Sequence, residues 1–389
     1  MPHGLYIQVP FCQTKCTYCN FHTGVFSAGL QSPYISAVCR EMKMFRKWSE
    51  RAGLGCFPNA EAPLSIDTVY VGGGTPSMLD PADLARLLDT ARESFPCDWT
   101  EVTLEADPET ITPERAAAWR AAGFNRISLG AQSFDDRELA AAGRLHRRVD
   151  LYAADRTLRD AGFANISFDL IAGLAHQTRA SWSDSLQRLI DLHPEHISIY
   201  MLEIDEASRL GAESLAGGAR YGAGALPSDD DVADFYESAR SVLAAARYEQ
   251  YEISSWARPG FRSRHNLKYW QRQPYFGFGA GAHSFDGRER WAKVHDPAAY
   301  TAAIEQGLWP IEQRQHVSPA QALEEELFLG LRQLDGIDVA AIEAHYGRDL
   351  HARLVPLLDQ GLIELNGSTL RLAPARLAVS NEVFVSLLD

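Results

Sequence analysis

Short β-rich runs alternate with helical hydrophobic patterns from the N-terminus to about residue 255, and this alternation constrains the fold more than any other feature. The strand patterns lie at residues 5–9, 68–71, 102–105, 126–129, 166–171 and 197–201, and a seventh run follows at 251–254. The helical patterns lie at residues 33–48, 81–94, 113–122, 151–160 and 182–192. Because βα units of this kind set their strands side by side in parallel, the pattern predicts an α/β fold with a partial (βα)6 barrel over residues 1–255.

The alternation of strand and helix patterns ends after this region. Residues 211–228 are rich in Gly and Ala and predict a surface loop before a helix at 231–247, and residues 256–314 predict a connecting segment. From residue 315 onward, three helical patterns precede two alternating strands around an Asn366-Gly367 turn, which predicts a winged-helix-like α+β domain over 315–389. Winged helices often bind DNA, but five Lys and Arg against eleven Asp and Glu favour a lid or docking role here.

The composition is that of an acidic globular chain. Of 389 residues, 46% are hydrophobic, and 37 Lys and Arg against 51 Asp and Glu give a net charge of −14. This excludes disorder, coiled coil and collagen, and it is opposite to what binding of a phosphate backbone requires, so we expect no nucleic-acid partner. The N-terminus has no basic stretch followed by an apolar run, and no window approaches the ~18 apolar residues of a spanning helix. We therefore expect a cytoplasmic protein.

Three cysteines directly after the first strand give the strongest chemical signal. Cys12, Cys16 and Cys19 have the spacing C-x3-C-x2-C. Soft thiolates select zinc or iron–sulfur clusters, and three ligands on a cubane cluster would leave one iron open for chemistry. The alternative is a zinc site with His22 as the fourth ligand. The remaining cysteines are expected to be structural: Cys39, Cys56 and Cys97.

The cysteine loop, with Tyr18 before its last cysteine, resembles that of the radical S-adenosylmethionine (SAM) enzymes. The resemblance implies a 4Fe-4S cluster on the three cysteines and SAM on the fourth iron. Gly73, Gly74 and Thr75 follow the second strand pattern in a glycine-rich turn, and Ser77 breaks the dinucleotide-binding fingerprint there. The resemblance instead implies a turn whose backbone meets the methionyl amine of SAM.

Polar side chains follow the strand patterns in positions suited to SAM. Glu105, Gln132, Arg144 and Asp169 lie at or just after successive strand ends, where barrel sites are built. SAM carries an amine, a carboxylate, a sulfonium and ribose hydroxyls, so acid, amide and guanidinium partners are chemically apt. Their order resembles the branch that contains coproporphyrinogen dehydrogenase and HemW. The resemblance implies that the following residues bind cofactor: Tyr6, Tyr18, Gly73, Gly74, Thr75, Glu105, Gln132, Arg144 and Asp169.

Two features resemble the HemW group of haem chaperones more than the dehydrogenases. The dehydrogenases carry a further cysteine where this chain has Phe21, and they carry an N-terminal extension before the cluster. His265, Asn266, Tyr269 and Trp270 match the group's H-N-x-x-Y-W motif. Haem iron needs an axial donor and aromatic rings can cover the macrocycle, so His265 is the leading haem-ligand candidate. The run 277–282, followed by His283 as a reserve candidate, is explained equally by a flat ligand or by close backbone packing.

Two functions from different classes follow from the resemblance. The first is a haem chaperone that binds haem, a 4Fe-4S cluster and SAM, and delivers haem to respiratory haem proteins. Such a protein would meet the membrane peripherally through its partners, and a homodimer remains open. The second is a radical SAM enzyme acting on a tetrapyrrole, by coproporphyrinogen oxidation, methyl transfer or haem ring opening. The resemblance favours the chaperone over an oxygen-independent coproporphyrinogen III dehydrogenase, while a zinc-stabilised barrel is a third reading.

Overall fold

A curved sheet with helices on its outer face forms the body of the protein. The computed structural model describes residues 2–56, 64–95 and 98–387, so Cys97 lies outside the described residues. The sheet has the strand order β12-β11-β10-β9-β1-β2-β3-β4-β5-β6-β8-β7. Its central part is parallel throughout and consists of β1 (His3–Val9), β2 (Ile66–Gly73), β3 (Glu101–Ala106), β4 (Arg126–Gln132), β5 (Ile166–Ala172) and β6 (His196–Met201).

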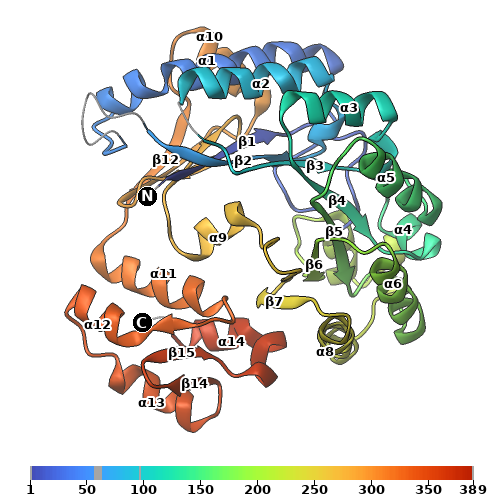
Figure 1. The fold of residues 1–389 in the computed structure, drawn as a ribbon, viewed down its shortest axis with the longest axis vertical. Helices are drawn as coiled ribbons and strands as arrows, with labels where there is room; N and C mark the ends of the chain where they lie inside the picture. Colours follow the sequence, from blue (N-terminus) through green and yellow to red (C-terminus); the bar gives the residue numbers. More distant parts are fainter. Residues whose placement is uncertain (1, 57–63, 96–97, 388–389) are drawn as a thin grey trace.

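The crossover helices cover the outer face of this sheet, as Figure 1 shows. They are α1 (Gln31–Arg51), α2 (Pro81–Ser94), α3 (Pro113–Ala122), α4 (Asp136–Ala141), α5 (Arg148–Asp160), α6 (Arg179–Asp191) and α8 (Asp229–Ala245). The strands are apolar and almost fully buried because helices cover one face and the barrel interior the other. The predicted fold class, a partial barrel of βα units followed by a small α+β domain, is confirmed.

Local signals fix the starts of several helices. Asp80 accepts a hydrogen bond from the Ala82 amide at 2.8 Å before Pro81, and Thr112 caps α3 before Pro113. A proline in the first turn has no amide hydrogen to leave unpaired, so a cap followed by proline is a strong helix start. The helices predicted at 81–94 and 113–122 have these same bounds in the structure.

The loop expected at 211–228 is partly helical. α7 (Arg209–Leu215) begins one residue after Ser208, whose side chain accepts a hydrogen bond from the Gly211 amide, and a 3-10 turn follows at Arg220–Ala225. The expectation of an irregular loop was wrong in its first part, because the cap at Ser208 and helix-forming residues after it outweigh the two glycines at 217 and 218.

Residues 256–314 extend the sheet beyond β1. The segment contains α9 (Arg264–Trp270), β9 (Tyr275–Phe278), β10 (His283–Phe285), β11 (Glu289–Lys293) and α10 (Pro297–Glu305), and β12 (Ile311–His316) follows. At the other edge lie β7 (Glu249–Glu252) and β8 (Ser255–Ala257). The glycines of the 277–282 run serve close packing: a Cβ atom at Gly277 would collide with the His283 carbonyl, and one at Gly279 would lie 2.7 Å from the Gln8 carbonyl oxygen.

A buried ion pair holds this extension to α1. Lys293 donates to the Glu41 carboxylate, and both side chains are completely buried. Tyr300 and Trp309 donate to the same carboxylate at 2.6 and 3.0 Å, and the Gly279 amide does so at 3.1 Å. Every donor comes from the 277–309 region, so one acidic residue of α1 organises much of the extension.

The C-terminal domain packs across the open side of the curved sheet, with α9 between the two (Figure 1). It contains α11 (Pro319–Leu331), α12 (Val339–Tyr346), α13 (His351–Asp359), α14 (Ser380–Val385) and a small antiparallel sheet of β13 (Ile337–Asp338), β15 (Thr369–Leu372) and β14 (Ile363–Asn366). Backbone hydrogen bonds from Ile253 to Arg332 and from Leu334 to Tyr251 dock it on the β7 edge.

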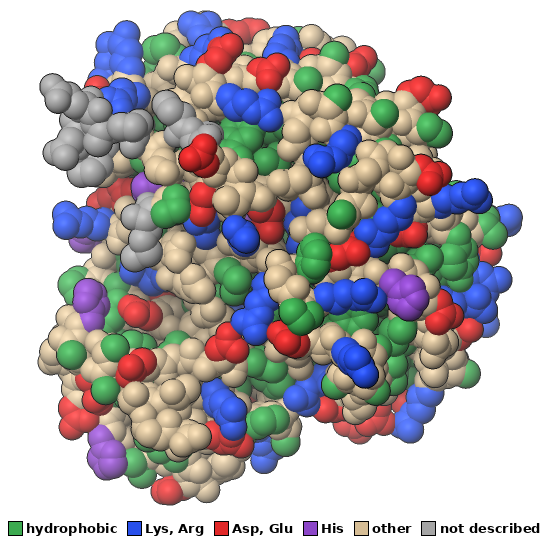
Figure 2. All heavy atoms as spheres, viewed as in Figure 1, with side chains coloured by type: hydrophobic (Ala, Val, Ile, Leu, Met, Phe, Trp, Pro, Cys, Tyr) green, Lys and Arg blue, Asp and Glu red, His purple; other side chains and the backbone are tan. Residues whose placement is uncertain are grey.

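The surface carries charges of both signs. Lys and Arg side chains are interspersed with Asp and Glu over the face that Figure 2 shows. Among the described residues, no helix is long and apolar enough to cross a membrane.

Candidate cofactor site

A cavity of about 670 Å³ opens where the parallel strands end. The cysteine loop, the strand ends, α9 and the C-terminal domain all contribute to its walls. Of the residues proposed from the sequence as ligands or cofactor contacts, Tyr6, His265, His22 and the reserve candidate His283 do not line it. Those that do are Cys12, Cys16, Tyr18, Cys19, Gly73, Gly74, Thr75, Glu105, Gln132, Arg144 and Asp169.

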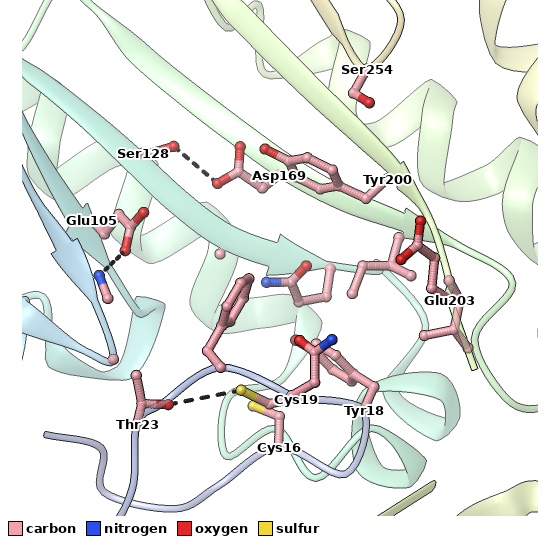
Figure 3. Close-up of a pocket in the computed structure, with 18 of the residues that line it drawn as sticks. Cys16, Tyr18, Cys19, Thr23, Glu105, Ser128, Asp169, Tyr200, Glu203 and Ser254 are labelled. Carbon is pink, nitrogen blue, oxygen red and sulfur yellow. Dashed lines mark hydrogen bonds between the residues drawn. The ribbon is translucent and has the colours of Figure 1, made fainter. Parts of the chain in front are cut away.

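The cysteine loop forms one wall of the cavity, and Figure 3 shows Cys16, Tyr18 and Cys19 together on it. The Cys12 amide donates to the Gly24 carbonyl at 2.9 Å, which closes the loop on itself. The Thr17 amide and hydroxyl donate to the Ala142 and Ala141 carbonyls at 3.0 and 3.1 Å. These bonds tie the middle of the loop to the end of α4, so the thiols are held against the cavity by residues far along the chain.

The surroundings of the loop suit an iron–sulfur cluster. A Cβ atom at Gly74 would lie 2.5 Å from the Phe11 carbonyl and 2.9 Å from the Cys12 sulfur, so only glycine allows the turn to lie this close to the thiols. Burial raises the pKa of Cys12, and iron would offset this by binding the thiolate. Three thiols could ligate three irons of a cubane cluster and would leave the fourth iron to a small molecule. His22, proposed as the ligand of the zinc alternative, lies against His295 with ring centroids 4.0 Å apart and the rings tilted by 35°.

Glu105 faces the glycine turn. Its carboxylate accepts hydrogen bonds from the Gly73 amide and the Tyr70 hydroxyl, both at 2.8 Å. Burial raises the pKa of Glu105 to about 7, and the two hydrogen bonds oppose that rise. A carboxylate in this position can bind a primary ammonium group, whose charge would compensate for the loss of solvent.

Asp169 lies further along the same wall, on β5. Ser128 and Ser167 donate to its carboxylate at 2.9 and 3.3 Å, and Figure 3 shows the first of these bonds. Burial raises the pKa of this carboxyl group as well. Gln132 ends β4 with φ at 65°, in the left-handed region, where β4 loses its register with β5. Backbone strain at a non-glycine residue is common where a side chain is directed into a functional site.

Arg144 connects the strand wall to the cysteine loop. It forms an ion pair with Asp107, donates to the Gly130 carbonyl at 3.0 Å and reaches the Cys16 sulfur at 3.4 Å. Its side chain is only 7% exposed. A fixed cation here favours a negatively charged cluster or ligand in the cavity.

Tyr6 and His265 lie behind the cavity wall. The Tyr6 hydroxyl donates to Gln8 at 2.7 Å, and the Gln8 side chain lies where a Cβ of Gly73 would be, so Tyr6 supports the glycine turn from behind. His265 is 1% exposed, and its two ring nitrogens lie 3.0 Å from the Thr68 hydroxyl and 2.8 Å from the Tyr269 hydroxyl. Burial lowers the pKa of His265 to about 3, so the ring is neutral. His283, the reserve candidate, is exposed at the start of β10.

The second half of the cavity was proposed from the sequence only in part, through the H-N-x-x-Y-W motif. In Figure 3, Tyr200, Glu203 and Ser254 lie across from the cysteines. Strand-end position could have signalled Tyr200, and the H-N-x-x-Y-W motif contains three more of these residues. The C-terminal residues had no local signal, since only the docking of the domain brings them here. Other members include Glu252, Asn266, Tyr269, Trp270, Arg332 and Asn381.

Phe21 marks the mouth of the cavity. It lines the cavity while 67% of the residue stays exposed. An apolar ring this exposed, beside the cysteine loop, offers a surface to a large flat ligand or to a partner.

Comparison with known proteins agrees with this architecture. Residues 6–189 match the Radical SAM superfamily, and residues 317–375 match the HemN C-terminal domain. The heme chaperone HemW of Bacillus subtilis (strain 168) is 33% identical over 98% of this chain and 98% of its own length. The bovine mitochondrial radical S-adenosyl methionine domain-containing protein 1 is 33% identical over 99% of this chain and 87% of its length.

A solved structure shows the same fold. The coproporphyrinogen III oxidase HemN from Escherichia coli superposes with a TM-score of 0.81, covering 100% of this chain and 90% of that one at 21% identity. The full-length similarity to HemW proteins confirms the group that the sequence motifs indicated. The chain therefore belongs to the HemW family within the radical SAM superfamily.

Proposed function

We propose that this protein is a haem chaperone that holds a 4Fe-4S cluster and SAM, binds haem in the adjoining part of the same cavity, and delivers it to respiratory haem proteins. The observation that carries the proposal is that one cavity is lined both by the cysteine loop and by Asn266, Tyr269 and Trp270 of α9. Full-length relatives are named heme chaperones, which supports the same reading.

The cofactor half has residues for each group that it would hold. Cys12, Cys16 and Cys19 would ligate the cluster, Glu105 would accept a hydrogen bond from the SAM amino group, and Asp169 would accept from ribose hydroxyls. Cluster and SAM together supply one-electron chemistry when bound. The chain's own contribution is to orient SAM with the glycine turn at Gly73 and to hold Arg144 against the cluster loop.

The part of the cavity proposed to bind haem has aromatic side chains in its wall, and His265 of the H-N-x-x-Y-W motif lies behind them. Tyr269 and Trp270 line the cavity and offer apolar ring faces to a macrocycle. His265 remains the proposed axial ligand, but its ring would have to leave Tyr269 or Thr68 to reach iron. Ligation by His265 therefore requires a rearrangement of α9.

The test is an anaerobic haem titration of cluster-reconstituted protein, followed by the porphyrin absorption band and then by transfer to an apo haem protein. We expect saturable, stoichiometric binding and loss of the bound haem to the acceptor. Protein that binds no haem, or keeps it in the presence of an apo acceptor, would contradict the chaperone proposal.

His265 is tested in the same titration against a matched control. His265→Ala removes the ring, whereas Thr68→Val removes only its buried partner. If His265 ligates iron, His265→Ala shifts the absorption band and weakens binding, and Thr68→Val keeps the wild-type spectrum. Identical spectra for all three proteins would limit His265 to a structural role.

The radical enzyme remains a second candidate because the polar groups suited to SAM are all in place around the cavity, Glu105 and Asp169 among them. It predicts multiple-turnover formation of 5′-deoxyadenosine coupled to a modified tetrapyrrole. Reductive incubation with coproporphyrinogen and with haem tests this, and the absence of any coupled product would leave the chaperone function alone.

A further inference from the structure

Among the described residues, two buried N–H groups in the half of the cavity wall away from the cysteine loop have no hydrogen-bond partner, and a third, Arg144 Nε, belongs to the cysteine side. The first two are Trp270 Nε1 and Arg332 Nε. A buried donor without an acceptor costs free energy, so such donors in a native protein need an explanation. Both side chains line the cavity, so a ligand there could supply the acceptor once the side chains turn to expose the two nitrogens, which have almost no accessible surface in this structure.

The two donors are held in one small unit at the junction of the domains. The Arg332 guanidinium carbon lies 4.4 Å from the centre of the Trp270 ring, which is cation–π stacking distance. Arg332 follows the last residue of α11, and its carbonyl accepts a hydrogen bond from the Ile253 amide at 3.1 Å. The backbone of the C-terminal domain therefore fixes the arginine against α9.

Glu252 balances the charge of the partly buried Arg332 side chain without occupying all of its donors. Its carboxylate, 3% exposed, accepts from Arg332 Nη2 at 3.2 Å. This single contact compensates the positive charge and leaves Nε free, whereas a bidentate pair would occupy more of the guanidinium fork. Glu252 thus holds Arg332 in position, and the guanidinium keeps Nε to donate to a ligand.

We propose that Arg332 and Trp270 together bind a carboxylate of the tetrapyrrole, which under the function proposed above is a haem propionate. Arginine is the preferred partner of planar carboxylates, and an indole N–H can donate to the same group. The assignment rests on the proposed function. It makes the C-terminal domain, through Arg332, a direct participant in haem binding.

SAM also carries a carboxylate, but a different arginine is placed to bind it. Arg144, which contacts Cys16, serves the cysteine side of the cavity. Arg332 directly follows α11 and pairs with Glu252 of β7. SAM bound to an iron of the cluster would have its carboxylate at the cysteine loop, so the second arginine is left for a different ligand.

The experiment compares haem with haem dimethyl ester, in which both propionates are blocked, using anaerobic titrations of the full-length, reconstituted protein. The variants are Arg332→Gln and Trp270→Phe, which keeps the ring and removes the N–H. Arg272→Gln is the matched control, because Arg272 pairs with Glu325 of α11 at 2.8 Å but does not line the cavity. SAM affinity is measured for each protein in parallel.

The wild type should bind haem about tenfold more tightly than the ester, as expected for one charge-assisted hydrogen-bond unit. Arg332→Gln should lose this preference and bind both ligands alike, Trp270→Phe should lose part of it, and Arg272→Gln should keep it. Equal wild-type affinities for haem and ester would overturn the carboxylate site and leave the chaperone function standing. A selective loss of SAM affinity in Arg332→Gln would assign the site to SAM instead, and no binding of either porphyrin would overturn the function as well.

Discussion

Arg144 donates a hydrogen bond to the sulfur of Cys16 at 3.4 Å, while its Nη2 atom pairs with Asp107. One side chain therefore joins a proposed cluster ligand to an ion pair at the strand ends. Because Asp107 and the Gly130 carbonyl hold the guanidinium in place, its position does not depend on the bound cofactor. Hydrogen bonds to cluster sulfurs and nearby positive charge both raise a cluster's reduction potential.

Arg144→Gln should therefore make the cluster harder to reduce. We expect the potential to fall by tens of millivolts, because a positive charge and a sulfur hydrogen bond are lost together. A redox titration followed by electron paramagnetic resonance measures it, with the exposed Arg137→Gln as the control. An unchanged potential in a fully loaded Arg144→Gln protein would show that the Arg144–Cys16 contact does not persist around the cluster.

Glu105 should make SAM binding dependent on pH. Burial raises its pKa to about 7, so the free protein holds a proton there at lower pH, and the N–H donors of the SAM amino group favour the ionised form. SAM affinity should therefore increase as the pH rises through about 7, with release of about half a proton per SAM at that pH. Titration calorimetry in two buffers of different ionisation enthalpy measures the released proton.

The same shift has a consequence for the free protein's stability. The folded pKa of Glu105 lies above its unfolded value, so the folded state holds the proton longer, and stability falls as the pH rises from about 4.5 through 7. Glu105→Gln cannot ionise and should show neither this contribution nor the SAM-linked proton release. Proton release that persists in Glu105→Gln would assign the titration to another group.

The sequence predicts those elements whose signals are local. α2 and α3 have their predicted bounds because Asp80 and Thr112 cap them and a proline follows each cap. β11 and β12 were not predicted. β12 is mostly exposed and polar at the sheet edge, so it lacks an alternating apolar pattern, and its pairing depends on residues distant in the sequence.

The residues of the candidate site also divide into those with a local sequence signal and those without one. Cys12, Cys16 and Cys19 lie close together in the sequence, so their spacing alone predicts a metal site. Glu105 could be assigned to the same site because parallel strands end at one rim of the barrel. Arg332 could not, since its partner Trp270 is 62 positions earlier and only the docking of the C-terminal domain brings the two together. The motif identified His265 but could not reveal that Thr68 and Tyr269 lie beside both ring nitrogens.

The buried pair of Glu41 and Lys293 should control the stability of the sheet extension. Lys293→Met leaves a carboxylate with no cation in a completely buried site, which should cost about 3–5 kcal/mol of unfolding free energy. Denaturant unfolding measures this loss. The exposed pair of Lys43 and Glu93 provides the control, because Lys43→Met should change stability by less than about 1 kcal/mol.

A second substitution distinguishes two causes of the expected stability loss, the unpaired charge of Glu41 and the lost packing of Lys293. Glu41→Gln combined with Lys293→Met removes the unpaired charge and keeps a polar group for Tyr300 and Trp309. The double variant should recover part of the stability. If it is no more stable than Lys293→Met alone, the cost arises from packing around the lysine and not from the isolated carboxylate.

The three cysteines of the loop should act as one unit in holding the cluster. Cys16→Ala leaves two thiolates for a cubane that needs three from this chain, so the variant should lose its brown colour and almost all iron and acid-labile sulfide after anaerobic reconstitution. Cys39→Ala is the matched control: Cys39 lies on α1, and its sulfur is 4.0 Å from the Arg86 carbonyl, away from the cavity lining. Its iron content should equal that of the wild type. Full iron and sulfide in Cys16→Ala would overturn the assignment of the triad, and a colourless wild type that binds zinc would support the alternative metal.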